Sequence, residues 1–356
     1  MRKHYLDNIR WATVILVVIY HIFYMFNHIG VLGGVGPLGE SMYPDIIMYV
    51  VYPWFMVLMF LVAGISARYS LSKRTHKEFL KERVVKFLPP TTLGLFVFHF
   101  ISGYINLRIG GATELMPSFL IYPVSVLSGQ GPLWFIQLLL VFSLILVLVR
   151  KIDKNDKFYN LCKKCNTVII LLFGILLWGA SQIFNVPVIT VYRIGIYLTA
   201  FLLGYFVFSH DEVIERVVRI RIPMLCLALI GSIAYTIFYF GENCCDNPVL
   251  KSFFTNAYMW IAILAILGCF KKYFDKTNKV ASYLCKSSFG IYIIHYPALL
   301  VPAYLFYTYT TLPAGIIYLL VGVIGISATF LLYEGIRRVP VLRFMILGIK
   351  KNKKAE

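Results

Sequence analysis

Long apolar segments separated by short polar connections run through the whole chain. Each segment holds roughly 20 residues, the length that an α-helix needs to cross the hydrocarbon core of a bilayer. The second contains Pro53 and the ninth contains Pro297 and Pro302, which membrane helices tolerate as kinks. The pattern predicts ten membrane-spanning helices, at residues 9–29, 46–67, 88–107, 132–149, 167–184, 190–208, 222–240, 252–270, 284–305 and 313–335.

The composition supports this interpretation. Hydrophobic residues make up 60% of the 356 residues, and the mean hydropathy is +0.78. A soluble domain cannot bury so much apolar surface. The first apolar run is too long for the core of a cleavable signal and lacks a small-residue cleavage site, so we expect it to remain as an anchor. We therefore expect an all-α, polytopic membrane helix bundle of one domain, residues 1–356, with a basic cytoplasmic tail at 337–356.

The basic residues are distributed unevenly along the chain. The net charge is +18, and 31 of the 34 lysines and arginines fall at the N-terminus, in alternate connections and in the tail. Cytoplasmic loops carry this excess in membrane proteins, so we expect both termini in the cytoplasm and a multi-pass protein of the cell (plasma or inner) membrane. The basic loops would attract anionic lipid headgroups, and their distribution gives no reason to expect nucleic acid as a partner.

Arg10 and His21 lie eleven residues apart in the first apolar segment, LDNIRWATVILVVIYHIFYMF. A helix turns about 100° per residue, so His21 returns to within about 20° of the same face, about 16 Å further along the axis. This spacing predicts Arg10 at one membrane edge and His21 near the midplane. An ionisable side chain at that depth is costly and indicates a functional site. The alternative is a histidine that only links helices by a hydrogen bond.

The connection from Ala67 to Lys86 reads ARYSLSKRTHKEFLKERVVK and has apolar residues at helical spacing. It predicts a basic amphipathic helix on the inner membrane surface. Arg83 and Lys86 are three residues apart and share one face of that helix. Such a pair can bind phosphates at the membrane edge, but for this segment taken alone we favour simple attraction to lipid headgroups.

Several other polar residues fall inside predicted spans, where each should face the bundle interior or water. Tyr292 and His295 are three residues apart and lie on one side of a helix. Interhelical hydrogen bonding is the simpler explanation for each residue singly, and we favour it for Gln137 and Gln182. Arg193 could pair with an outer acidic group or with an acceptor substrate. The intramembrane polar residues are His99, Gln137, Gln182, Arg193, His295 and Glu334.

The seven cysteines give no framework for a metal or for disulfides. Cys162 and Cys165 form a Cys-Lys-Lys-Cys, but a structural zinc site needs four ligands and no second pair with suitable spacing is near. Cys244 and Cys245 are adjacent, and a bridge between neighbours would be strained. We therefore expect no metal site.

Six motifs in order along the chain together resemble the acyltransferase 3 family, integral-membrane enzymes that O-acylate sugars. Two positions depart from the family pattern: Lys86 replaces an arginine, and Ala63-Gly64-Ile65-Ser66 stands in place of a Ser-Gly-Phe turn. Lysine keeps the charge but loses the forked geometry of arginine. The motifs are Asp7, Arg10 and His21; Gly64 and Ser66; Arg83 and Lys86; Leu133, Trp134 and Phe135; Ser288, Gly290, Ile291, Tyr292 and His295; and Tyr333 and Glu334.

The resemblance implies an enzyme that takes an acyl group from cytoplasmic acyl-coenzyme A and transfers it to a hydroxyl of a glycan or another acceptor at the outer face. Acyl-coenzyme A is then a donor substrate, and no permanently bound cofactor is implied. The spacing near the start is similar to that of periplasmic glucan succinyltransferases, and both acetyl and succinyl donors remain open.

The resemblance also assigns roles to residues. His21 would act as general base or as a nucleophile that forms an acyl-imidazole, and the sequence does not choose between the two. Arg10, Arg83, Lys86 and Asp7 would bind the donor. Supporting roles would fall to Tyr20, Trp134, Tyr292, His295, Glu334 and Arg193.

Three other classes of membrane protein remain as alternatives. A secondary transporter would show internal pseudo-symmetry, which the two halves of the chain lack. A flippase for a glycan or lipid intermediate would move its substrate without a covalent product. In a structural scaffold the buried ionisable groups would be dispensable.

The charge distribution makes a prediction about topology. Reporter fusions at Lys154 and Lys276 should lie inside the cell, and fusions near Gly36 and Cys244 should lie outside, because basic loops stay in the cytoplasm. An external reporter at either lysine position would contradict the ten-span arrangement.

Overall fold

The computed structural model describes residues 3–186 and 192–350. In these ranges the chain is helical and forms no β-strand, apart from an isolated bridge between Asn185 and Arg193. The chain divides into two compact units. The first unit comprises residues 1–13, 46–80 and 141–285, and the second comprises 14–45, 81–140 and 286–356. Helices α1, α4, α8 and α16 contribute residues to both units.

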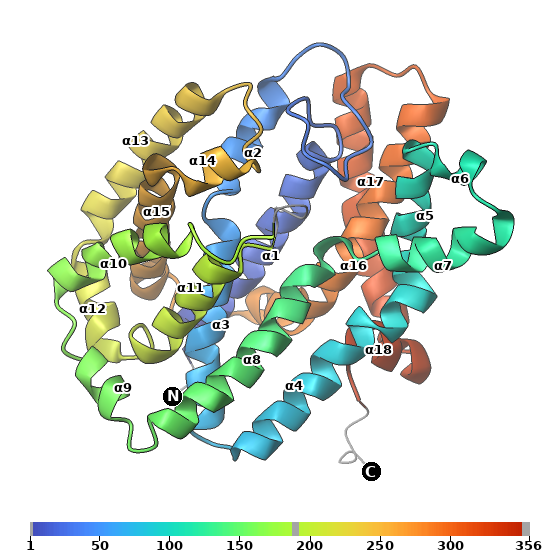
Figure 1. The fold of residues 1–356 in the computed structure, drawn as a ribbon. Coiled ribbons are helices and arrows are strands. Elements are labelled where there is room, and N and C mark those ends of the chain that lie inside the picture. The colour runs from blue at the N-terminus through green and yellow to red at the C-terminus, as the bar shows by residue number, and fades with distance from the viewer. Residues whose placement is uncertain (1–2, 187–191, 351–356) are drawn as a thin grey trace. The chain divides into compact units, whose positions relative to one another are not determined.

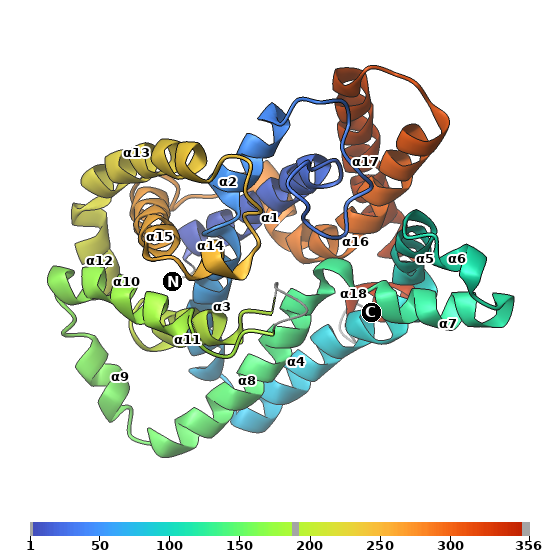
Figure 2. The ribbon, with the colours of Figure 1, turned by 45° about the horizontal axis from the view of Figure 1, so that its top comes forward.

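The first unit contains two pairs of helices that run side by side in both ribbon views, α3 with α11 and α13 with α15 (Figures 1 and 2). Short helices connect them. The helices wholly within this unit are α2 (Ile46–Val51), α3 (Phe55–Leu71), α9 (Lys157–Cys162), α10 (Thr167–Ala180), α11 (Ile194–Phe206), α12 (Asp211–Arg219), α13 (Arg221–Tyr239), α14 (Asn247–Lys251) and α15 (Phe253–Tyr273).

The second unit contains the short helices α5, α6 and α7, which lie together in both views, and the C-terminal helices (Figure 2). Its own elements are η1 (Tyr43–Asp45), η2 (Leu95–His99, a π-helical turn), α5 (Phe100–Ile109), α6 (Ala112–Leu115), α7 (Ser118–Ser128), η3 (Gly131–Leu133), α17 (Ala314–Ile336) and α18 (Pro340–Leu347). The four shared helices are α1 (His4–Tyr24), α4 (His76–Thr91), α8 (Trp134–Ile152) and α16 (Lys279–Tyr309).

Within the described residues, eight helical segments are long and apolar enough to cross a membrane, or nine if α11 and α12 together form one bent span. The prediction of a polytopic helix bundle is confirmed, but two of the ten expected spans differ. The fifth, 167–184, is the 14-residue α10, which at about 21 Å is shorter than the hydrocarbon core. The sixth, 190–208, is the 13-residue α11, which meets α12 at 108°.

The expected surface helix of residues 67–86 is also wrong in its bounds. α3 continues to Leu71, and a new helix begins at His76 and leads into the third membrane segment, His76–Ile109. Thr75 and Glu78 form a reciprocal cap at this start: the Thr75 hydroxyl accepts from the Glu78 amide at 3.3 Å, and the Glu78 carboxylate accepts from the Thr75 amide at 2.9 Å. This Thr-x-x-Glu cap sets the beginning of α4.

Close contact between α3 and α11 holds the first unit together. A Cβ placed on Gly64 would lie 1.9 Å from the Phe201 carbonyl oxygen, and one on Gly204 would lie 2.0 Å from that of Leu61. No larger residue fits at either position with the backbones where they are. Small residues that let two backbones approach are the usual basis of helix association in a bilayer, where lipid removes most of the hydrophobic driving force.

One carboxylate joins three elements at an end of the first unit. Asp156, which precedes α9, accepts two hydrogen bonds from Arg68 of α3, at 2.9 and 3.1 Å, and a further one from Arg150 of α8. The Arg68 guanidinium also lies 3.5 Å from the ring centre of Tyr159. The Arg68 guanidinium holds the pKa of the Asp156 carboxyl below its usual range, and Arg150 adds to this effect, against the opposing effect of burial.

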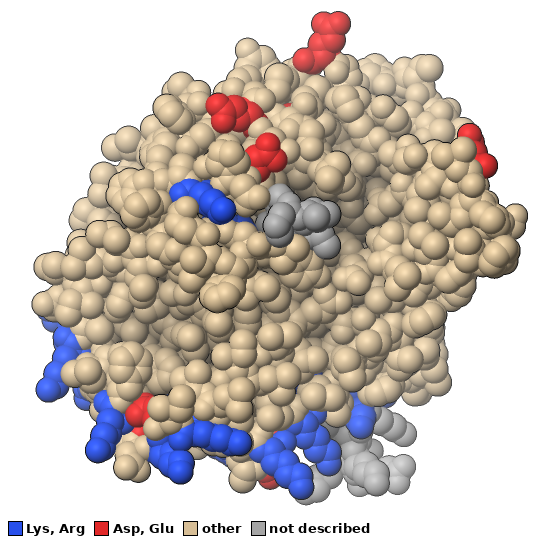
Figure 3. Space-filling model, in the orientation of Figure 1, with Lys and Arg blue, Asp and Glu red and all other residues tan. Residues whose placement is uncertain are grey.

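Basic side chains cluster at this end of the unit. On the face drawn in Figure 3, blue side chains gather over the end of α8 and over α9, the connection that carries six of the 34 basic residues. The cluster corresponds to one of the basic loops that the sequence pattern assigns to the cytoplasm.

The Asp156 contacts make a prediction about stability and pH. Asp156→Asn should lower the free energy of unfolding by about 1–3 kcal/mol at pH 7, because charge-assisted bonds to two arginines are lost from a part-exposed site. Because the native pKa of Asp156 is lowered, the contribution is present above the unfolded value of about 3.9 and is lost as the pH falls through the lowered native pKa. Thermal unfolding in detergent should therefore separate wild type from variant at pH 7, and the difference should shrink as the pH falls below about 3.9.

Candidate functional site

His21 and His295 meet in the second unit, where α1 packs against α16. The Nε2 atom of His295 lies 3.3 Å from Nδ1 of His21, and the ring centres are 4.9 Å apart. His295 is fully buried, and His21 is partly exposed. Within the described residues no carboxylate hydrogen-bonds to either ring. The structure thus brings together two histidines that are 274 positions apart in the chain.

The backbone of α1 determines which nitrogen of His21 is open. Nδ1 lies 2.7 Å from the Val17 carbonyl oxygen, one helical turn earlier. A carbonyl oxygen only accepts hydrogen bonds, so a neutral His21 carries its proton on Nδ1. Nε2 then bears the lone pair, and no hydrogen-bond partner lies against it in the part of the chain that the structure describes. His21 therefore presents a basic nitrogen to the partly exposed side of the site.

Three tyrosine rings surround His21, from α1 and α16. Tyr20, Tyr24 and Tyr296 have ring centres 5.2, 5.3 and 5.4 Å from that of His21. The hydroxyls of Tyr24 and Tyr296 donate to the carbonyls of Leu32 and Gly33 in the loop of residues 25–45. These contacts attach the loop to the same rings that border His21.

Tyr20 was expected from the sequence, whereas Tyr24 and Tyr296 were not. Tyr24 follows His21 by three residues, so helical spacing alone could have indicated it. Tyr296 is adjacent to His295 in the chain, but its approach to His21 depends on how α1 packs against α16.

Tyr292 and the start of α8 support α16 at this level. The buried Tyr292 hydroxyl donates to the Pro132 carbonyl at 2.6 Å, and its ring packs edge-on against Phe135 at 5.4 Å. Trp134 begins α8 and contacts Phe135. The Leu-Trp-Phe motif and the Tyr-x-x-His motif thus form one packed layer beside the histidines.

Arg10 lies on the part of α1 that belongs to the first unit. It donates to the Asp7 carboxylate at 3.1 Å and to the Ser66 hydroxyl of α3 at 2.9 Å. The serine that departs from the family pattern is therefore a partner of the arginine in the opening motif. Sequence reasoning noted its displacement but gave it no role, because its meeting with Arg10 is a tertiary contact.

Arg83 and Lys86 lie on α4 in the second unit, each beside an aromatic ring. The Arg83 guanidinium lies 5.5 Å from the ring centre of Phe87, and the Lys86 ammonium lies 4.7 Å from that of Phe289 in α16. Both side chains are partly exposed. The basic motif is thus in contact with the segment Ser288–His295, the last long motif of the sequence.

Two of the expected supporting residues make structural contacts elsewhere. Arg193, 3% exposed at the start of α11, donates to the Leu250 carbonyl at 3.0 Å. Glu334, near the end of α17, pairs with Arg337 at 2.8 Å and with Arg338 at 3.8 Å. Gln182 donates to the Lys251 carbonyl at 2.9 Å and links α10 to α14, as expected for an interhelical hydrogen bond.

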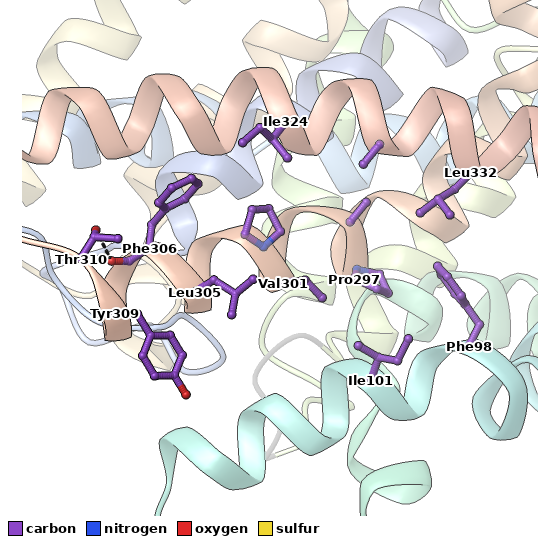
Figure 4. Close-up of a pocket in the computed structure, with 13 residues that line it drawn as sticks. Phe98, Ile101, Pro297, Val301, Leu305, Phe306, Tyr309, Thr310, Ile324 and Leu332 are labelled. Atoms are coloured by element: carbon purple, nitrogen blue, oxygen red, sulfur yellow. Dashed lines mark hydrogen bonds between the residues drawn. The ribbon is translucent and has the colours of Figure 1, made fainter. Parts of the chain in front are cut away.

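An apolar pocket of about 630 Å³ lies among α5, α16 and α17 (Figure 4). In the close-up, Pro297 and Val301 of α16 face Phe98 and Ile101, and Ile324 of α17 covers the other side. On α16 the residues that line the pocket begin at Pro297, two residues beyond His295. Its lining is almost wholly hydrocarbon, so the pocket has room for an apolar group but few polar groups that could bind or react with one.

The Cys-Lys-Lys-Cys pair provides no prepared thiolate. None of the seven cysteines forms a disulfide. Burial raises the pKa of the Cys162 thiol to about 11 and also raises the pKa of Cys165, so both stay protonated at neutral pH, whereas a thiolate is needed for metal binding or attack. Among the described residues, no group of three His, Cys, Asp or Glu side chains is arranged to hold a metal ion.

Comparison with known protein families gives one match. The family model described as an acyltransferase domain matches residues 3–334, which is nearly the whole chain. Comparison with curated proteins gives no match, and neither does comparison with solved structures.

Proposed function

Because the chain belongs to the acyltransferase 3 family and is a membrane acyltransferase, we propose that it moves an acetyl or succinyl group from acyl-coenzyme A to a hydroxyl of a glycan or a related acceptor. The observation that carries this proposal is the open Nε2 of His21. It is a basic nitrogen on a candidate membrane helix, in the position that the family's opening motif assigns to its histidine.

In the proposed reaction His21 acts as the general base. Nε2 accepts the proton of the acceptor hydroxyl as that oxygen attacks the thioester carbonyl. The tetrahedral intermediate collapses to the O-acyl product, and the C–S bond breaks. The coenzyme A sulfur then takes the proton back from Nε2, so that the enzyme returns to its starting state.

A nucleophilic role for the same nitrogen would give an acyl-imidazole before the acceptor arrives. Intact-protein mass measured after mixing with acyl-coenzyme A, without acceptor, separates the two routes. The open lone pair on Nε2 serves either route, and we propose the base because it needs no covalent intermediate.

The donor would be held by the basic residues of the family motifs. Arg83 and Lys86 would bind the phosphates, and the aromatic rings beneath them limit the freedom of their side chains. Asp7 and Ser66 fix the Arg10 guanidinium, and the eleven residues from Arg10 to His21 correspond to a helical rise of about 16 Å, comparable to an extended pantetheine arm. The donor would enter from the cytoplasmic side of the cell membrane. The basic loops lie on that side if both termini are internal.

A transporter or flippase of a glycan or lipid intermediate is the alternative. It would leave no covalent product, whereas the proposed enzyme leaves an O-acyl ester. Mass spectrometry of envelope glycans from cells that express wild type or His21→Ala distinguishes them. An ester that is present only with wild type supports acyl transfer, and identical glycans in both strains would contradict it.

Charge reversal of the basic pair should weaken donor binding. Each charge-assisted phosphate contact contributes about 1.5–3 kcal/mol, so Arg83→Glu with Lys86→Glu should raise the KM for acyl-coenzyme A more than about tenfold. Lys77→Glu with Lys81→Glu is the matched control, because both lysines are exposed on the same helix. Equal KM values for the two double variants would show that Arg83 and Lys86 do not bind the donor and only contact lipid headgroups.

Removal of the base should reduce turnover strongly and leave the fold intact. His21→Ala should lower kcat by about 10²–10⁴, the usual contribution of a general base. Loss of a purely structural interhelical hydrogen bond costs only about 0.6 kcal/mol, so thermal stability should stay near wild type. Thiol release from acetyl- and succinyl-coenzyme A, measured in nanodiscs with envelope glycan as acceptor, tests this. Full activity of His21→Ala would end the proposed mechanism.

A further inference from the structure

The contacts of His295 determine where its proton lies. Nδ1 of His295 is 2.7 Å from the Tyr292 carbonyl oxygen, which can only accept, so a neutral His295 carries its proton on Nδ1. Its Nε2 therefore bears the lone pair. This lone pair faces Nδ1 of His21 at 3.3 Å, and the single proton on that nitrogen also faces the Val17 carbonyl oxygen at 2.7 Å. The hydrogen bond between the rings thus runs from His21 to His295, as the longer arm of a donation that the Nδ1–H shares between His295 and Val17.

The direction of this bond matters when the site gains a proton. A proton on Nε2 of His21 leaves every existing hydrogen bond in place and strengthens the donation from Nδ1 to His295. A proton on Nε2 of His295 would set two N–H groups against each other at 3.3 Å. The arrangement therefore directs the proton to the outer nitrogen of His21.

We propose that His295 is a positioning residue that orients His21 and stabilises its imidazolium during acyl transfer. The proposal rests on the proposed role of His21 as base. His295 would do for His21 what a buried carboxylate does for the histidine of a Ser-His-Asp triad, but as a neutral acceptor. A neutral partner suits a fully buried position, because a carboxylate there would carry a large desolvation cost.

The surroundings of His295 keep its acceptor aimed at His21. Its own Nδ1 is held by the backbone of α16, one turn earlier. The hydroxyl of Tyr292, bonded to Pro132, ties the same turn of α16 to the start of α8. The Tyr-x-x-His motif therefore supplies both the acceptor and the anchor that fixes its position.

The test compares His295→Leu with His295→Gln in nanodiscs, with acetyl- and succinyl-coenzyme A as donors. Leucine removes the acceptor, and kcat should fall about 10- to 100-fold, the effect of one hydrogen bond to a charged group, while the KM for the donor stays unchanged. Glutamine can offer a carbonyl oxygen at this position and should recover a large part of the loss. His99→Leu is the matched control, since His99 is equally buried and its ring nitrogens have no hydrogen-bond partner among the described residues.

A double variant separates positioning from packing. In the His21→Ala background, His295→Leu should change the residual rate little, because its effect passes through His21. A further large loss in that background would show a structural role and overturn the proposal. If His21→Ala is inactive while His295→Leu keeps wild-type kcat, the positioning role fails and the proposed function stands. If His21→Ala is fully active, the proposed function itself fails.

A measurement independent of turnover completes the test. The ¹⁵N NMR spectrum of histidine-labelled protein at neutral pH distinguishes protons on Nδ1 from protons on Nε2. Both His21 and His295 should show the Nδ1–H tautomer. An Nε2–H tautomer at either residue would remove the hydrogen bond that runs from His21 to His295 and contradict the proposal whatever the activity.

Discussion

A polar group on a membrane helix must find its hydrogen-bond partner inside the protein, and this constraint shapes the parts of the structure that matter most. In lipid no water can replace a missing partner. His21 and His295 each satisfy it first with a carbonyl of their own helix and then with each other. Because each carbonyl accepts a hydrogen bond from Nδ1, the backbone fixes the tautomer of both histidines. The lone pair of each ring therefore lies on Nε2 before any substrate binds.

The same constraint shows in the use of hydroxylated and small residues. In α4, which contains Pro89 and Pro90, the hydroxyls of Thr91 and Thr92 donate to the carbonyls of Phe87 and Leu88, one turn earlier on the same helix. Gly103 of α5 lets the Ser125 carbonyl of α7 approach to a point where a Cβ would be 1.8 Å away. Small residues thus allow close helix packing, and hydroxylated residues form hydrogen bonds within their own helix.

The sequence predicted the helical membrane fold and the shared helix of Arg10 and His21, because both follow from apolar run length and the 3.6-residue period. It did not predict the meeting of His21 with His295 or of Arg10 with Ser66, since each is a tertiary contact between distant segments. The start of α4 was readable from the Thr-x-x-Glu cap at Thr75 and Glu78, which the apolar pattern alone does not reveal. The short α10 was not readable, because an apolar run of span length can end in a turn, here at Ser181–Phe184.

The region after the family match also contacts the basic motif. The match ends at residue 334, yet α18 follows at Pro340–Leu347 and ends at Gly348 with a positive φ of 63°. A Cβ at Gly348 would lie 2.1 Å from the Lys86 carbonyl oxygen. The C-terminal helix therefore packs directly on the turn of α4 that carries Lys86, so that this turn is supported from outside the family-matched region.

The attachment of the loop 25–45 to Tyr24 and Tyr296 has an energetic consequence. Two neutral hydrogen bonds contribute about 0.5–1.5 kcal/mol each, so the form in which both are broken lies about 1–3 kcal/mol above the attached form. At equilibrium that released form would make up about 1–20% of the molecules. A molecule that reaches His21 only after release would bind about 5- to 100-fold more weakly than its own contacts imply, and a loop variant that lacks these bonds would remove that penalty.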